Sequence, residues 1–86
     1  MQLSIITPAG TLFQGACKLV QMPGTDGLFE ILDRHAPMVA LLGKGKVKVQ
    51  EPDGKELFFD IEGGALKVGD NEATLLVESV KRKQLG

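Results

Sequence analysis

The residues of this chain that could do chemistry gather around its only histidine. His35 follows Asp33 and Glu30 closely, so a carboxylate could orient its imidazole as a general base. Such a base needs a nucleophile, but no serine occupies a strained turn, and Cys17 falls within a strand pattern. One cysteine and one histidine also cannot form a Cys/His metal site or an internal disulfide. We therefore predict no catalytic residue, metal or cofactor, and we expect His35 to bond backbone carbonyls in its turn or to contact a partner.

The segment Gly24-Thr25-Asp26-Gly27 has the composition of a tight turn. Its two glycines allow positive φ at either end of the reversal, and Asp26 can bond its own backbone two residues on. The segment lacks the Gly-Lys-Ser/Thr of a phosphate-binding loop and does not open a helix. We predict a turn here and a second bend at residues 33–37, where Pro37 excludes a helix.

The residues also leave open a stand-alone small β-barrel binding module, of the oligonucleotide-binding or carrier type. Lys55 follows Asp53-Gly54 at a predicted hairpin tip, like the modified lysine of lipoyl or biotinyl carriers, although the neighbours that the modifying enzymes expect are absent. The four phenylalanines could stack bases, but stacking needs a basic groove. Ten basic and eleven acidic residues, a net charge of −1, give no such field, so we predict no nucleic-acid partner.

The elements that must position these residues are predicted to be short strands. Residues 2–7 alternate apolar and polar side chains with the two-residue period of a half-buried strand. Residues 46–50 alternate most cleanly, and their lysines predict an edge strand. The apolar run Met38–Leu42 predicts a strand buried on both faces. Further strands are expected at residues 11–13, 16–22, 55–62, 65–68 and 72–78.

This rhythm of strands and turns predicts the fold class. With eleven glycines and no long helical period, the chain is expected to be all-β, a two-sheet β-sandwich or flattened barrel of about ten short strands. Its 86 residues suffice for a single domain, residues 1–86, with a thin core. Phe58, Leu76, Met38 and the pair Leu28-Phe29 then compete for interior positions, so either the core absorbs them or some face a partner.

Taken together, the residues resemble the amino-terminal domain of the epsilon subunit of F-type ATP synthases, called delta in mitochondria. The resemblance spans nearly the whole chain, and its most specific block is His35-Ala36-Pro37. The other blocks are Leu3-Ser4-Ile5-Ile6-Thr7-Pro8, Phe13-Gln14-Gly15, Pro23-Gly24-Thr25-Asp26-Gly27, Ile31, Met38-Val39, Gly45, Gly63-Gly64, residues 66–68 and Ala73-Thr74-Leu75-Leu76. The resemblance implies a ten-stranded sandwich in the central stalk of the rotor, a non-catalytic part that joins the gamma subunit to the membrane c-ring.

The resemblance also implies contacts for particular residues. Gly24, Thr25, Asp26, Gly27 and Leu28 would meet the polar loops of the c-ring, and Thr7, His35 and Ala40 would touch gamma. Many relatives have Glu-Leu-Gly-Ile where this chain has Leu28-Phe29-Glu30-Ile31, and Pro-Gly where it has Asp33-Arg34.

The expected location is the cytoplasmic face of the bacterial inner membrane, by way of the complex. The sequence shows no signal-peptide pattern and no run of ~20 apolar residues, so direct insertion into the membrane is not expected. Most bacterial members continue into a two-helix domain, so nucleotide binding or inhibition through that domain is not expected of these 86 residues.

Overall fold

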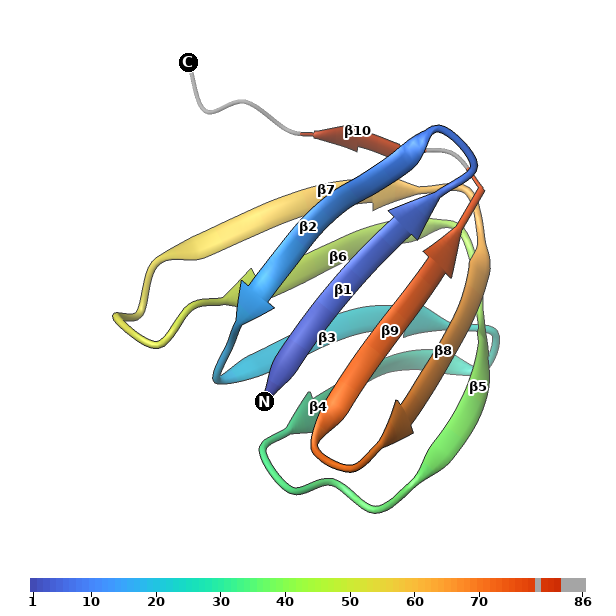
Figure 1. Cartoon of the computed structure of the whole chain (residues 1–86). Coiled ribbons are helices and arrows are strands. Elements are labelled where there is room, and N and C mark those ends of the chain that lie inside the picture. Colours follow the sequence, from blue (N-terminus) through green and yellow to red (C-terminus); the bar gives the residue numbers. More distant parts are fainter. Residues whose placement is uncertain (79, 83–86) are drawn as a thin grey trace.

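The computed structural model describes residues 1–78 and the backbone of residues 80–82, and these residues form strands and turns without a helix. Figure 1 shows them as short strands in two facing layers. The strands are β1 (Gln2–Thr7), β2 (Gly10–Ala16), β3 (Leu19–Gly24), β4 (Gly27–Leu32), β5 (Met38–Leu42), β6 (Gly45–Gln50), β7 (Glu56–Ile61), β8 (Gly64–Gly69), β9 (Glu72–Val77) and β10 (Val80–Arg82).

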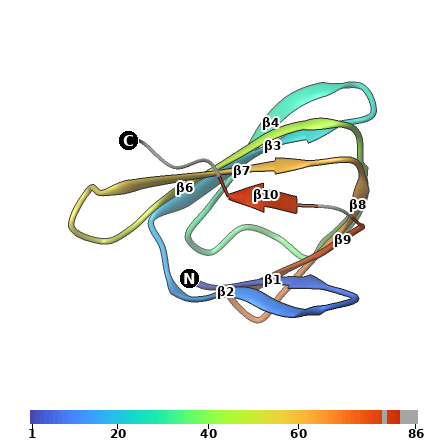
Figure 2. The ribbon, with the colours of Figure 1, turned by 90° about the horizontal axis from the view of Figure 1, so that it is seen from above.

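The strand pairing defines the two layers. One layer has the order β4-β3-β6-β7-β10 and the other β5-β8-β9-β1-β2, and Figure 2 shows them edge on. Neighbours in the described chain are antiparallel except β1 and β9, which are parallel. The layers are joined at one corner, where Gly24 at the end of β3 pairs with Leu42 at the end of β5. The predicted all-β sandwich of about ten short strands is confirmed.

The core lies between the layers because alternate residues of each strand point inward. Phe13 of β2 and Phe59 of β7 meet edge to face across the layers, with ring centroids 6.3 Å apart and planes at 64°. Every buried side chain in the described chain is apolar, so no buried side-chain nitrogen or oxygen there lacks a hydrogen-bond partner. The buried set is Leu3, Ile5, Cys17, Val20, Met22, Pro23, Ile31, Leu42, Val47, Val49, Phe59, Ile61, Leu66, Val68, Ala73, Leu75 and Val77.

The prediction of one strand over residues 16–22 was wrong, because the chain changes layers there. The N–H of Cys17 donates to the carbonyl of Met1, 2.9 Å away, beside the β1 layer. The next N–H, of Lys18, donates to the carbonyl of Gln50, 2.8 Å away, at the end of β6 in the other layer. Two successive amides therefore bond to different layers, which ends β2 and starts β3.

The prediction that residues 46–50 form an edge strand was also wrong. β6 lies between β3 and β7, and only its inward valines behave as expected. Its outer lysines lie along neighbouring side chains: Lys46 Nζ is 5.8 Å from the ring centroid of Phe58, and Lys48 Nζ is 3.7 Å from a Glu56 carboxylate oxygen. Alternating lysines thus mark a solvated face, which an interior strand can have as readily as an edge strand. Phe58, one of the residues expected to compete for interior positions, is therefore half-buried on the outer face, where Lys46 contacts its ring.

The prediction that Met38–Leu42 is buried on both faces was wrong as well. Met38, Ala40 and Leu42 point toward the core, whereas Val39 and Leu41 remain 74% and 67% exposed. A two-layer sandwich has no third layer to cover the outer face of β5. An uninterrupted apolar run in this fold therefore leaves half of its side chains in water.

Candidate functional site

Strand directions place the candidate residues at two opposite ends of the sandwich. Thr7 and the Thr25-Asp26 turn lie at one end, because β1, β9, β5 and β3 all finish there in register. His35 lies at the other end, in the loop whose Arg34 N–H donates to Asn71 Oδ1 in the β8–β9 turn at 2.8 Å. Ala40 is in the middle of β5. We call these the Thr25 end and the His35 end.

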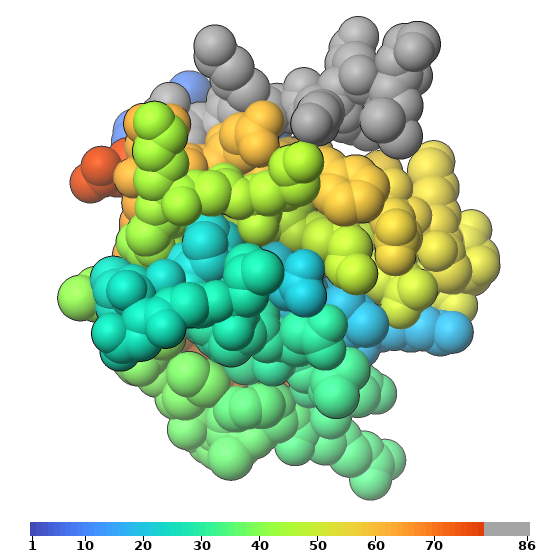
Figure 3. Space-filling model, turned by 180° about the vertical axis from the view of Figure 1, so that it is seen from behind, coloured from blue at the N-terminus to red at the C-terminus, as the bar shows by residue number. Residues whose placement is uncertain are grey.

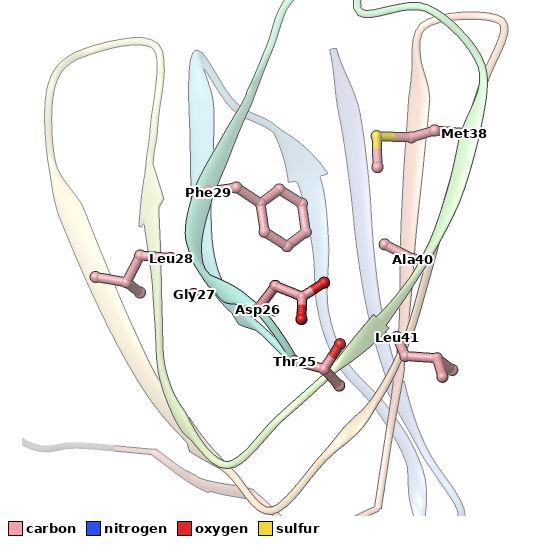
Figure 4. Close-up of a pocket in the computed structure, with 9 residues that line it drawn as sticks. Thr25, Asp26, Gly27, Leu28, Phe29, Met38, Ala40 and Leu41 are labelled. Carbon is pink, nitrogen blue, oxygen red and sulfur yellow. The ribbon is translucent and has the colours of Figure 1, made fainter.

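A hollow opens at the Thr25 end, between the β3–β4 turn and β5. Its volume is about 520 Å³, and it is lined by Gly24, Thr25, Asp26, Gly27, Leu28, Phe29, Met38, Ala40 and Leu41. In Figure 4, Phe29 from β4 and Met38 and Ala40 from β5 point toward one another, and the Asp26 carboxylate lies beside the Phe29 ring. The hollow exists because β4 and β5 diverge from the corner where the layers join. The structure thus brings all five predicted ring-contact residues together with Ala40.

The two glycines of the turn are needed for different reasons. A Cβ added to Gly24 would lie 2.8 Å from Cε1 of the Phe29 ring, so only glycine lets the ring pack against the backbone there. Gly27 has φ +130°, a conformation that side-chain-bearing residues rarely adopt. The turn is also tied to β5, since Thr25 N–H donates to the Leu41 carbonyl at 3.3 Å.

Asp26 is the one charged side chain among the residues that line this hollow. Within the described chain, no lysine, arginine or histidine nitrogen lies within the ion-pair distance of its carboxylate. Lys44, in the neighbouring turn, lies 3.8 Å from Glu62 instead. The hollow therefore combines an apolar floor with one negative charge that this part of the chain does not neutralise.

Thr7 and His35, two further predicted contact residues, each form hydrogen bonds with the backbone of their own turn. Thr7 Oγ1 donates to the Gly10 carbonyl and accepts from the Ala9 N–H, both at 3.1 Å. His35 is exposed, and its Nδ1 lies 2.8 Å from the Ala36 carbonyl oxygen, to which it can donate. The expected bond from this imidazole to a backbone carbonyl is confirmed. The structure does not bring Thr7 and His35 together.

Sequence reasoning missed an apolar row on the outer face of the β5-β8-β9-β1 layer. Register places Leu41 beside Ala65, Ala65 beside Leu76, and Leu76 beside Ile6. Leu41 and Leu76 are 67% and 53% exposed, and a shallow hollow along the row is bordered by Thr7. We call Ile6, Leu41, Ala65 and Leu76 the outer row. Its signals in the sequence were Ile6 and Leu76, which are apolar residues on the polar sides of their strands, and the uninterrupted apolar run that contains Leu41.

The opposite face, of the β4-β3-β6-β7 layer, is mixed in character. Figure 3 shows this side of the molecule. Here Gln21 Nε2 donates to Glu30 Oε1 at 3.2 Å, and the lysine contacts of β6 lie on the same face. No group of three or more histidine, cysteine, aspartate or glutamate side chains in the described chain could hold a metal ion. Nor do the described residues include a helix of the length and hydropathy needed to cross a membrane.

Comparison with known proteins gives a consistent family match. The family described as "ATP synthase, Delta/Epsilon chain, beta-sandwich domain" matches residues 1–83. An ATP synthase epsilon chain of Chlorobium limicola is 46% identical over 79 residues, which are 92% of this chain and 90% of that protein. An epsilon chain of Nitratiruptor sp. is 42% identical over 78 residues, and there this chain spans only 60% of the relative.

Solved structures share the fold at low sequence identity. A chain of the Euglena gracilis mitochondrial ATP synthase, in a complex described as OSCP/F1/c-ring, superposes with a TM-score of 0.87 at 20% identity, over 93% of this chain and 51% of that one. A chain of the Tetrahymena thermophila mitochondrial ATP synthase, described as central stalk/c-ring, gives 0.79 at 19% identity, over 95% and 66%.

Proposed function

This chain belongs to the family of ATP synthase delta and epsilon chain β-sandwich domains, and we propose that it is a non-catalytic subunit of the rotor. In this role residues 1–86 act as one unit in the central stalk. The unit joins gamma to the c-ring, so that rotation driven by proton flow reaches catalytic sites on other subunits. Its place is the cytoplasmic face of the bacterial inner membrane, where it is held through the complex.

The outer row carries the gamma side of this proposal. Exposed leucines from two strands lie in one row on the outer sheet face. A single exposed leucine would need no explanation, but a contiguous exposed apolar surface is typical of an interaction site. Thr7 borders this row at the Thr25 end, and His35 lies at the far end of the same layer. A partner lying lengthwise along the layer would reach both residues. This arrangement supports Thr7 and His35 as markers of the gamma side, whereas Ala40 points away from the outer row, toward the core and the hollow, and the row does not support it as a gamma contact.

The Thr25 end carries the ring side of the proposal. Gly24, Thr25, Asp26, Gly27 and Leu28 form an exposed hairpin turn, and Leu28 is 67% exposed. The turn is pinned to β5 by backbone hydrogen bonds, so it presents its polar side chains in a defined geometry. The outer row runs from β5 to β1 along the sheet face, whereas the turn lies at the end of the sandwich, and the two surfaces meet at Leu41. In this proposal gamma and the ring therefore bind as neighbours.

Co-purification tests the proposal directly. The tagged chain is expressed with gamma and c-ring of the same organism, each alone and both together. We expect it to capture gamma alone and a gamma and c-ring assembly, and to hydrolyse no ATP by itself. Failure to retain gamma or the assembly would refute the rotor role. Salt-dependent binding of single-stranded nucleic acid, or acylation of Lys55, would instead favour the stand-alone binding module.

A further inference from the structure

The hollow at the Thr25 end has the chemistry of a receptor for one type of side chain. Its floor is apolar and adaptable, formed by the Phe29 ring, the Met38 thioether and Ala40. The Asp26 carboxylate lines the same hollow, and within the described chain no cation pairs with it. The occupant must therefore have an apolar stem, a flat or cationic group that can lie on an aromatic ring, and a positive charge.

From these features we propose that the hollow binds an arginine side chain of the partner that docks at the Thr25 end. A guanidinium is planar and weakly hydrated, stacks on aromatic faces, and pairs with a carboxylate through two parallel hydrogen bonds. Asp26 and Phe29, which both line the hollow, supply these two partners. The inference rests on the proposed function, in which the docking partner is the c-ring, and it adds which kind of side chain the turn recognises.

Other occupants fit the hollow less well. A carboxylate or phosphate would be repelled by Asp26, the only charge among the lining residues. An aliphatic side chain would cover the same floor but leave the Asp26 carboxylate partly desolvated without a partner. A lysine would supply the charge, but a compact ammonium cannot both stack on Phe29 and bond the carboxylate in two places.

Binding can be measured with a small probe. The labelled chain is titrated with N-acetyl-arginine amide, and separately with N-acetyl-citrulline amide, which has nearly the same shape and no charge. In heteronuclear NMR spectra we expect saturable shifts of Thr25, Gly27, Phe29 and Ala40 with the arginine probe, and binding roughly tenfold weaker with citrulline. Equal binding of both probes, or shifts that do not saturate or fall elsewhere, would overturn the inference.

Variants test the two recognition elements separately. Asp26→Asn keeps the shape of the side chain and should weaken arginine binding by roughly tenfold. The matched control is Asp53→Asn, which removes the same charge from the exposed turn between β6 and β7, where Asp53 Oδ1 accepts from Lys55 N–H. This variant should leave binding unchanged. Phe29→Leu keeps an apolar floor but removes the ring face, and should also weaken arginine binding. An unaltered titration for either hollow variant would contradict the proposed receptor.

The same variants separate this inference from the proposed function. If the wild-type chain captures the c-ring assembly and Asp26→Asn captures it equally well, the arginine receptor is refuted while the rotor role stands. If the wild-type chain fails to capture the assembly, the rotor role falls, and the probe titration still decides whether the hollow recognises a guanidinium.

Discussion

Replacing the two leucines of the outer row by threonine should separate binding from folding. Leu41→Thr and Leu76→Thr introduce a β-branched side chain, which suits a strand, and remove most of the exposed apolar surface. Leu41 is 67% exposed and Leu76 53%, so each has more than half of its surface left to bury against a partner.

The expected loss of affinity follows from that exposed surface. Complete burial of a leucine contributes about 2 kcal/mol, so covering the exposed part of each side chain contributes about 1 kcal/mol. The double variant should then bind gamma with a free energy about 2 kcal/mol less favourable, a roughly thirtyfold higher Kd. Its free energy of unfolding should stay within about 0.5 kcal/mol of wild type, because neither side chain fills the core.

Titration calorimetry with purified gamma gives the Kd, and urea unfolding followed by circular dichroism gives the stability. Leu32→Thr is the matched control, since Leu32 has the same 53% exposure as Leu76 but lies on β4 of the other layer. The control should bind gamma like wild type. The assignment of the gamma side would be refuted if Leu32→Thr weakened binding as much as Leu76→Thr, or if the double variant changed Kd by less than about threefold.

Three further predictions concern stability and the thiol. Gly64→Ala should lower the free energy of unfolding by at least about 3 kcal/mol, because the backbone of Gly64 has φ +154° and an added Cβ would lie 2.1 Å from the Leu76 carbonyl oxygen. A urea midpoint near that of wild type would contradict this prediction. Arg34→Gly should raise the free energy of unfolding by about 0.5–1 kcal/mol, because Arg34 has φ +63° and glycine keeps the backbone N–H that donates to Asn71. Arg34→Ala should give no such increase when both variants are compared by thermal unfolding. Burial raises the pKa of the Cys17 thiol, so a thiol reagent should modify it only as fast as the fold opens. The free energy of unfolding should also decline as pH rises through the unfolded pKa of about 8.5. Rapid modification of the native protein, or the same dependence of stability on pH in Cys17→Ala, would be inconsistent with that burial.

The predictions from sequence succeeded where local chemistry decides the structure. The Thr25-Asp26 turn and the bend before Pro37 formed as expected, because glycine and proline restrict the backbone whatever surrounds them. The alternation of β1 and β6 was also predicted correctly, since it reflects one buried and one solvated side. The family resemblance was carried by the same turn residues and is confirmed by the family match.

The predictions failed where a strand's neighbours decide the structure. The position of β6 between two strands, the change of layer at Cys17 and the open outer face of β5 depend on which segments pair across the chain. Apolar runs and lysine alternation look the same for an edge strand, an interior strand and a strand with one face in water. The competition for interior positions was likewise settled by packing: Phe29 and Met38 joined the core's margin, whereas Leu28 and Leu76 stayed exposed.

The sequence by itself thus determined the strands, the turns and the side of most strands that faces inward, because these follow from backbone restriction and from the two-residue period of a pleated chain. Only the tertiary structure decided that Leu41, Ala65, Leu76 and Ile6 form a row, and that Asp26 and Phe29 line one hollow with β5. Both surfaces combine residues from segments far apart in the chain. Their assembly depends on pairing register and on the single corner that joins the layers, which no local pattern encodes.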